Sequence, residues 1–252
     1  MDKWYEVPGK AGTNVIYSRV RLVRNLKEYP FPGRLTKEQS AELSEKLLGG
    51  LTGIASMDRM QYRFTHLERM GDLEKTALLE RRAINRSVIK KKDPTGMILS
   101  EDESTAILLN GDDHVRIQTL QTGLTLEQLY ERADKIDDYI SERFDYAFDE
   151  KYGYLTSFPT NVGTGLRAAV VLHLPMLSKN KNFNSLVADM GRFGTQVRGV
   201  YGEGAENFGS LYQISNQKTL GQTEREIIDI VRKAAQELDA QERRVRREYR
   251  QR

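Results

Sequence analysis

Five arginines of this chain recur where strands and turns are expected to meet, each beside a backbone bend. They are Arg19, Arg21, Arg116, Arg167 and Arg198. Guanidinium groups are planar, permanently charged and able to fork onto phosphate oxygens. Because phosphoryl transfer depends mainly on positioning and charge neutralisation, such a set suits a site for a polyphosphate. The pattern alone leaves open the alternative of five unrelated surface arginines.

A glycine-rich stretch, residues 157–168, reads Ser-Phe-Pro-Thr-Asn-Val-Gly-Thr-Gly-Leu-Arg-Ala. Pro159 and Asn161 interrupt regular structure, while Gly163 and Gly165 permit backbone conformations closed to bulkier residues. An apolar run follows, so the stretch predicts a turn that leads into a buried strand. Its backbone N–H groups beside the fixed guanidinium of Arg167 could hold a phosphate, although such loops also occur as plain turns.

Two adjacent carboxylates, Asp112 and Asp113, follow an apolar stretch that we expect to form a strand over residues 105–110. They could be an ordinary Asx turn after that strand or part of a site. Residues 15–23 also alternate as a strand does, with Val15, Tyr17, Arg19 and Arg21 on one face and Ile16, Ser18, Val20 and Leu22 on the other. Two arginines on one strand face indicate either a site or a solvated surface.

The remaining elements follow from capping and periodicity. Capping boxes at Thr36, Thr125 and Thr223 predict three helices. The first runs to about Leu48, the second carries apolar residues as far as Phe144, and the third is a long helix that carries them as far as Leu238. A fourth helix is expected over residues 177–190, and strands over 197–201 and 210–214. Residues 57–85 mix helical and extended signals, and residues 1–13 read as an irregular lead-in. No repeat or long linker divides the chain, so a single domain over residues 1–252 is expected.

Composition excludes several classes of protein. The chain has 252 residues, no cysteine and three histidines, which rules out disulfides and thiolate metal sites and argues against a zinc enzyme. No apolar run is long enough to cross a bilayer, so a cytoplasmic protein is expected. The net charge is +3, but residues 242–252 alone carry +4, and residues 1–241 therefore carry −1. Nucleic-acid binding is not indicated, and the basic tail, residues 240–252, is expected to be a solvated helix end.

Four ordered segments resemble the guanidino (phosphagen) kinases, which include creatine and arginine kinases. Residues 157–168 are similar to that family's signature C-P-[ST]-N-x-G-T-G-x-R-A, with Phe158 in place of the cysteine. Residues 18–25, 110–117 and 198–204 match further motifs of the family. The chain most resembles the bacterial branch, the protein arginine kinases. The resemblance implies an α/β (α+β) fold with a large, mainly antiparallel sheet flanked by helices.

The resemblance also implies ATP as the phosphoryl donor, with Mg²⁺ bridging its phosphates; no residue is assigned as a metal ligand. The nucleotide contacts that it implies are Ser18, Arg19, Val20, Arg21, Arg116, Arg167, Ala168, Ala169, Val170, Val171, Arg198, Gly199, Val200, Tyr201 and Gly202. Arg82 stands where the family often has a histidine that contacts adenine.

On the acceptor side, a guanidinium is a poor nucleophile, so two carboxylates must clamp it and take its proton. The family's two glutamates fall on Asp112, which is a methylene shorter, and Glu203. Asp113 matches a further acid of the pocket. Phe158 could stack on the guanidinium in place of the family's cysteine, or it could fill the pocket.

The first motif begins by Ser18, which leaves no room for the helical domain that closes over a small substrate in creatine-type kinases. We therefore expect a pocket that admits arginine side chains of proteins. The chain also stops before the carboxy-terminal domain with a phosphoarginine-sensing motif that the bacterial branch usually has. By resemblance, a heat-shock repressor and an ATP-dependent protease system are implied as partners. The alternatives are a catalytically impaired homologue that binds nucleotide or arginine-bearing partners, and a kinase of a free small guanidino compound.

Overall fold

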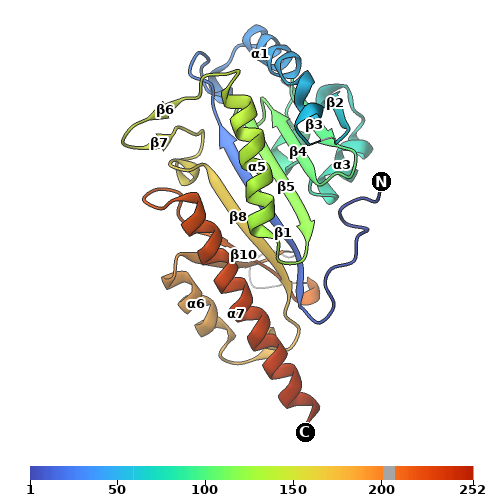
Figure 1. Cartoon of the computed structure of the whole chain (residues 1–252), viewed down its shortest axis with the longest axis vertical. Coiled ribbons are helices and arrows are strands. Elements are labelled where there is room, and N and C mark those ends of the chain that lie inside the picture. Colours follow the sequence, from blue (N-terminus) through green and yellow to red (C-terminus); the bar gives the residue numbers. More distant parts are fainter. Residues whose placement is uncertain (59, 201–207, 252) are drawn as a thin grey trace.

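An antiparallel sheet of eight strands forms the centre of the computed structural model, which describes residues 1–58, 60–200 and 208–251 (Figure 1). In spatial order its strands are β2 (Tyr62–His66), β3 (Gly96–Ser100), β4 (Thr105–Leu109), β5 (Val115–Thr122), β1 (Val15–Arg24), β8 (Leu166–His173), β10 (Leu211–Asn216) and β9 (Thr195–Gly199). A small hairpin, β6 (Phe148–Asp149) and β7 (Gly153–Tyr154), stands apart from this sheet. The predicted large antiparallel sheet is confirmed.

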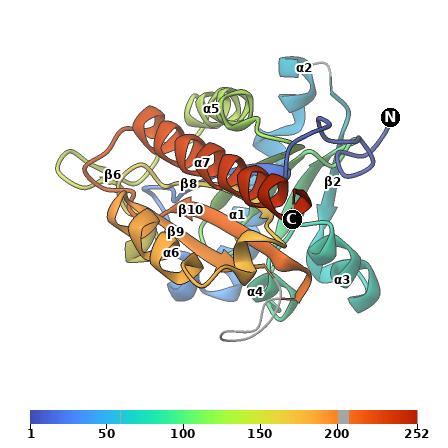
Figure 2. The ribbon, with the colours of Figure 1, turned by 90° about the horizontal axis from the view of Figure 1, so that it is seen from below.

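Helices flank both faces of this sheet. They are α1 (Lys37–Gly50), α2 (Ala55–Asp58), α3 (Asp72–Glu80), α4 (Arg86–Ile89), α5 (Leu126–Ser141), α6 (Phe183–Arg192) and α7 (Glu224–Arg250). Figure 2 shows α5 and α7 on one side of the sheet and α3 and α4 on the other. Within the described part of the chain, no helix is both long and apolar enough to cross a membrane.

Three apolar clusters decide which part of the sheet stays uncovered. The main core lies between the sheet and α1, α5 and α7. A second cluster packs α3 and α4 against the opposite face of β3 and β4. A third joins Trp4 of the lead-in to Tyr17, Leu120 and Val171 at the far end of the central strands. No helix of the described residues covers the middle of this second face, between the two smaller clusters.

Strand β1 delivers side chains alternately to the covered and the uncovered face. Val20 and Leu22 lie in the main core, so their neighbours Arg19 and Arg21 point to the uncovered face. The predicted alternation is wrong at the start of the strand, because the register with β8 shifts between Val15 and Tyr17. This irregularity turns Val15 into the main core.

Two of the three predicted capping boxes are confirmed. The hydroxyls of Thr36 and Thr223 accept hydrogen bonds from backbone N–H groups three residues later. The box at Thr125 is wrong, because its side chain makes no capping bond. The backbone N–H of Thr125 instead donates to Ser18 Oγ over 3.2 Å, which ties the start of α5 to β1.

The helix predicted over residues 177–190 is wrong in its first half. A single 3₁₀ turn, Leu177–Lys179, comes first, and α6 begins at Phe183. The cause lies in α7: the Glu242 carboxylate accepts hydrogen bonds from the backbone N–H groups of Met176 and Leu177, the latter over 2.7 Å. These bonds fix a turn where the apolar spacing alone indicates a helix.

The same contact corrects the expectation for the basic tail, residues 240–252. The tail is the last part of α7 and is helical as far as Arg250. It is not solvated from its beginning, because Glu242 has no exposed surface. A carboxylate that caps another turn therefore anchors the tail to the core.

Candidate active site

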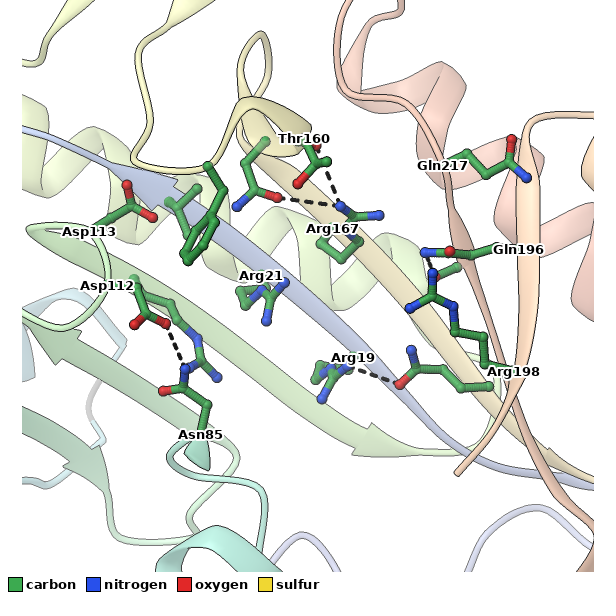
Figure 3. A pocket seen from close by; sticks show the side chains of 16 residues that line it. Arg19, Arg21, Asn85, Asp112, Asp113, Thr160, Arg167, Gln196, Arg198 and Gln217 are labelled. Carbon is green, nitrogen blue, oxygen red and sulfur yellow. Dashed lines mark hydrogen bonds between the residues drawn. The ribbon is translucent and has the colours of Figure 1, made fainter. Parts of the chain in front are cut away.

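A cavity of about 580 Å³ opens on the uncovered face of the sheet. It is lined by side chains that the sequence places far apart, including all five predicted arginines. The predicted residues that line it are Arg19, Arg21, Asp112, Asp113, Arg116, Phe158, Arg167 and Arg198. Figure 3 shows Asp112 and Asp113 at one side of this cavity, with Arg21 and Arg19 in the middle and Arg198 at the other side. The two carboxylates therefore lie at one side of a cavity that is otherwise rich in arginines.

The register of the strands sets the arginines beside one another. Arg21 on β1 lies directly opposite Arg167 on β8, and Gln118 on β5 is its partner on the other side. Like charges opposite each other destabilise an antiparallel pair. The structure thus gathers positive charge at a cost in stability, which indicates that the arrangement serves an anionic ligand.

Where a cavity arginine donates a hydrogen bond to a described residue, the acceptor is uncharged. Arg19 Nη2 donates to Gln213 Oε1 over 3.0 Å, and Arg167 Nη1 donates to the backbone carbonyl of Asn216 over 2.6 Å. The side chain of Arg21 makes no hydrogen bond or ion pair with any described residue. In the described part of the chain, none of the five arginines forms an ion pair with a carboxylate. Their charge is therefore not neutralised by those residues.

Arg116 is the most deeply placed of the five, with 7% of its surface exposed. Its Nη2 donates to Gln118 Oε1 over 2.7 Å. Its Nε and Nη1 are buried and have no hydrogen-bond partner among the residues described. Buried donors without partners are rare in proteins and costly, so these two N–H groups mark the place of a missing acceptor.

Burial and mutual repulsion lower the pKa values of arginines in this cluster. Burial lowers the pKa of Arg116 to about 10, and the nearby charge of Arg19 adds to the effect. The pKa of Arg21 falls well below its usual value, first through burial and then through Arg116, Arg19 and Arg167. The Asp112 carboxylate opposes both shifts. Arg116 remains charged at neutral pH, and a polyanion would relieve the repulsion within the cluster.

Asp112 is held in place by residues next to it in space. Its Oδ2 accepts hydrogen bonds from Asn85 Nδ2 over 2.7 Å and from Ser87 Oγ over 2.9 Å. Asn85 is the N-cap position of α4 and also lines the cavity. The other oxygen, Oδ1, accepts from no described residue. One carboxylate oxygen is thus fixed, and the second is available to a donor in the cavity.

Asp113 has a different environment, although it follows Asp112 directly. Its Oδ1 accepts hydrogen bonds from Asn25 Nδ2 over 2.8 Å and from the backbone N–H of Ser157 over 2.7 Å. The first contact reaches the end of β1, and the second holds the loop that carries Phe158. Asp113 therefore positions the loop at the mouth of the cavity.

Phe158 is 51% exposed and lines the same cavity as the two aspartates. Its backbone carbonyl accepts from Thr156 Oγ1 and from the backbone N–H of Asn161, which fixes the loop on both sides of the ring. The ring is thus presented to the cavity and to solvent. It does not fill the cavity of about 580 Å³, so space for a second substrate remains beside it.

The glycine-rich stretch forms the predicted turn and buried strand, and of the two alternatives left open for its backbone the structure favours the plain turn. The N–H groups of Gly163, Thr164 and Gly165 donate to the carbonyls of Tyr154, Thr219 and Asn161. Both glycines have positive φ, and an added Cβ at Gly163 would collide with the carbonyl of Thr219. The glycines thus serve close packing, and Arg167 alone of this stretch reaches the cavity with its charge.

Several residues predicted to contact nucleotide are not among those that line the cavity. The side chains of Ser18, Val20, Ala168 and Val170 face the helices, because they alternate with residues that face the cavity. Ala169 and Val171 are buried on the cavity side, and Val171 and Val200 belong to the cluster around Trp4. Gly199 ends β9. Arg82 does not line the cavity; it occupies a left-handed turn after α3. Tyr201, Gly202 and Glu203 lie outside the described residues.

Sequence reasoning missed the polar residues that hold the charged ones. These are Asn85, Ser87, Gln118 and Gln213. Asn85 ends a stretch, residues 57–85, that gives no clear pattern. A neutral amide leaves no charge signal in a sequence, and only the register of β10 on β8 brings Gln213 near Arg19.

The described residues include no group of three or more histidine, aspartate or glutamate side chains that could hold a metal ion. A divalent cation that arrives with a nucleotide needs fewer protein ligands, because phosphate oxygens and water supply most of its coordination. Asp112 and Asp113 are the carboxylates of the described chain that line this cavity. The donor set fits a magnesium ion carried by its nucleotide.

Comparison with known proteins shows which family the chain is similar to. The model of the ATP:guanido phosphotransferase C-terminal catalytic domain matches residues 45–245. A protein-arginine kinase of Caldanaerobacter subterraneus subsp. tengcongensis is 41% identical over 234 residues, which cover 93% of this chain and 69% of that protein. A protein-arginine kinase of Bacillus velezensis is 40% identical over 246 residues, 98% of this chain and 68% of the relative.

Solved structures show the same fold. A lombricine kinase superposes with a TM-score of 0.80 at 24% identity, covering 91% of this chain and 66% of that one. The duplicated taurocyamine kinase of Schistosoma mansoni, solved with bound components of a transition state analog, has a TM-score of 0.80 at 27% identity. The match covers 90% of this chain and 32% of that one. The cavity therefore lies in a fold that these kinases share.

Proposed function

The chain belongs to the ATP:guanido phosphotransferase family, and we propose that it transfers the γ-phosphoryl group of ATP to arginine side chains of proteins. One observation carries this proposal: a cluster of arginines without paired carboxylates faces Asp112, whose Oδ1 has no partner among the described residues, across one cavity. The cluster suits a polyphosphate, and the carboxylate suits a cation. A donor and an acceptor of opposite charge can meet between them.

On the donor side, Arg19, Arg116 and Arg167 hold the phosphates and spread the charge that develops during transfer. The unpartnered Nε and Nη1 of Arg116 are available for bonds to phosphate oxygens. Arg21 lies between the cluster and Asp112 in Figure 3, where the transferred group must pass. Mg²⁺, bound chiefly by the phosphate oxygens, would supply further neutralisation of their charge.

On the acceptor side, Asp112 Oδ1 binds one N–H of the substrate guanidinium and orients its nitrogen toward the γ-phosphorus. Glu203, which lies outside the described residues, is the second carboxylate by resemblance. The nitrogen forms a bond to phosphorus while the bond from phosphorus to the β,γ-bridging oxygen breaks. The guanidinium proton passes to a carboxylate, and ADP leaves with the bridging oxygen.

Phe158 gives the acceptor site its aromatic wall. Because the ring is half exposed at the mouth, it can stack on a guanidinium that enters from solvent, a contact worth about 0.5–2 kcal/mol. Asp113 supports this wall through its bond to Ser157 N. Nothing among the described residues closes over the mouth, which favours an arginine that is attached to a protein chain.

We extend the proposal to the organisation and setting of the chain. Residues 1–252 form a single catalytic domain built around one large sheet, and the protein acts in the cytoplasm. Its substrates are proteins with exposed arginines; a heat-shock repressor and an ATP-dependent protease system are partners implied by resemblance. The chain spans about 69% of the length of the first relative, so regulation by further segments is outside this proposal.

A specific observation supports one rival. Asp112 is short and has one oxygen engaged by Asn85 and Ser87, and Phe158 replaces the cysteine of the signature. A chain with these features could bind nucleotide and an arginine-bearing partner without transferring phosphate. The open cavity beside Phe158 admits a guanidinium in either case, so the transfer of phosphate itself distinguishes the kinase from this rival.

Incubation with γ-labelled ATP, Mg²⁺ and an arginine-rich protein tests the proposal. We expect acid-labile phosphate on arginine, with free arginine and creatine competing poorly. Phe158→Cys should raise the rate, because it restores an ionisable group beside the guanidinium. Nucleotide binding without any phosphoarginine would favour the rival, and turnover of a free guanidino compound without protein labelling would replace the substrate class.

A further inference from the structure

Two glutamines accept hydrogen bonds from arginines of the cavity. A carboxylate in either position would form an ion pair instead. Gln213 Oε1 accepts from Arg19 Nη2 over 3.0 Å, and Gln118 Oε1 accepts from Arg116 Nη2 over 2.7 Å. In each pair the acceptor is the oxygen of a neutral amide. Each arginine gives up one N–H group and keeps its full charge.

Gln118 is fixed at both ends of its amide. It is 1% exposed, and its Nε2 donates to the backbone carbonyl of Arg82. That carbonyl belongs to the left-handed turn after α3, where φ of Arg82 is 67°. Because Nε2 makes this bond, it is the oxygen of the amide that faces Arg116. The guanidinium of Arg116 is thereby oriented, with Nε and Nη1 left for a ligand.

Gln213 reaches Arg19 across a third strand. Arg19 on β1 pairs with Ala169 on β8, and β10 lies on the far side of β8. Gln213 is opposite Val171 in this register, so its contact with Arg19 runs diagonally across β8. The amide nitrogen of Gln213 donates to no described residue, so only its oxygen contributes to this contact.

Charge explains why an amide differs from a carboxylate here. A carboxylate would bind each guanidinium more tightly and remove part of the repulsion within the cluster. It would also place a negative charge next to the space that a polyphosphate must occupy, and like charges a few ångströms apart repel strongly in a partly buried site. An amide oxygen fixes the direction of the guanidinium without this penalty.

We propose that Gln118 and Gln213 are positioning residues that set the affinity of the site for polyphosphate, because they orient Arg116 and Arg19 without neutralising them. The inference rests on the proposed function, since it assigns the polyphosphate of the nucleotide to this cluster. Its ligand class is the polyphosphate chain itself. Inorganic tripolyphosphate, which has no base or ribose, is therefore a direct probe.

Gln213→Glu is the sharpest variant, because it adds a charge and removes no described hydrogen bond. Titration calorimetry at fixed ionic strength should show dissociation constants for tripolyphosphate and Mg·ATP that rise about tenfold or more. The thermal midpoint without ligand should stay the same or rise, because the new carboxylate pairs with Arg19. A residue that served only the fold would not separate affinity from stability in this way.

Gln213→Met is the matched control, since it removes the acceptor without adding charge. Its loss of affinity should be smaller than that of Gln213→Glu. Gln118→Glu provides a second site and should weaken binding likewise, although it also gives up the bond to Arg82. Should either glutamate variant fail to fold, the other decides.

Three outcomes are distinguishable. Wild-type binding with a large loss in the glutamate variant supports the inference. Wild-type binding with an unchanged glutamate variant overturns this inference and leaves the proposed function standing. A wild-type chain that binds neither Mg·ATP nor tripolyphosphate overturns both.

Discussion

Strand β1 sends arginines to both faces of the sheet, and the two environments differ in their balance of charge. On the helix-covered face, Arg24 is 2% exposed and forms an ion pair with Asp137 of α5 over 2.6 Å. Its guanidinium also lies 3.5 Å from the ring centre of Tyr154 and donates to the carbonyl of Thr164. On the other face, the side chain of Arg21 has no such partner among the described residues.

The comparison shows how one residue type serves two purposes a few positions apart. A buried guanidinium with a carboxylate, a carbonyl and an aromatic ring is satisfied, so it holds β1, α5 and the glycine-rich loop together. A guanidinium among others of the same charge is unsatisfied and awaits a polyanion. The presence or absence of a carboxylate, rather than burial, separates the structural arginine from those of the site.

The largest effect should come from the carboxylate on the cavity side. Asp112→Asn keeps the hydrogen bonds to Asn85 and Ser87 possible but removes the charge that clamps and accepts a proton. Phosphorylation of a protein substrate should slow by about 10²–10⁴-fold. Thermal stability should change little. A labelled-ATP assay measures the rate, and an unchanged rate would remove Asp112 from the reaction.

On the helix-covered face, where Arg24 is paired, Asp137→Asn should lower the stability of the fold instead of the rate. The change leaves the Arg24 charge buried without its carboxylate and weakens the bond that Tyr146 donates to Asp137 Oδ1. Removing one partner of a buried ion pair costs about 3–5 kcal/mol in the free energy of unfolding. Asp138→Asn, an exposed change on the same helix, should cost under about 0.5 kcal/mol. Urea unfolding of both variants compares them, and equal losses would contradict the assignment.

A smaller effect should appear with pH at His114, which is buried beside the end of β1. Its Nδ1 accepts from the backbone N–H of Leu26, and burial lowers its pKa to about 4. The unfolded chain binds this proton near pH 6.5 and the folded chain does not, so stability is lost as pH falls from about 6.5 to 4. The total is about 3 kcal/mol.

Urea unfolding over this pH range measures the effect. His114→Asn should be less stable at neutral pH, but its stability should fall less steeply below pH 6.5 than that of the wild type. Parallel curves for the two chains would show that His114 does not contribute the predicted pH dependence.

Much of this architecture can be predicted from the sequence, for physical reasons that apply at particular residues. Alternation in β1 places Arg19 and Arg21 on one face, and the family resemblance adds Arg116, Arg167 and Arg198 to the same site. Thr36 and Thr223 mark helix starts because a hydroxyl at an N-cap has a local bonding partner.

The features that could not be predicted from the sequence depend on contacts between distant segments. The backbone of the glycine-rich stretch suggested a phosphate cradle, but its N–H groups are used by Tyr154, Thr219 and Asn161. Glu242, in a tail whose composition is mainly basic, fixes the turn at Leu177 from across the fold. Neither partner could be found from spacing, because both depend on tertiary packing.

The most direct test of the distinction between satisfied and unsatisfied arginines uses Arg21→Met and Arg24→Met in one experiment. Thermal unfolding is followed with and without saturating Mg·ATP, which raises the midpoint of a chain that binds it. We predict that Arg21→Met keeps or raises the midpoint of the free chain and loses most of the ligand-induced rise. Arg24→Met should lower the midpoint of the free chain and retain the rise. The reverse pattern, with ligand response lost at Arg24 and stability lost at Arg21, would contradict the account.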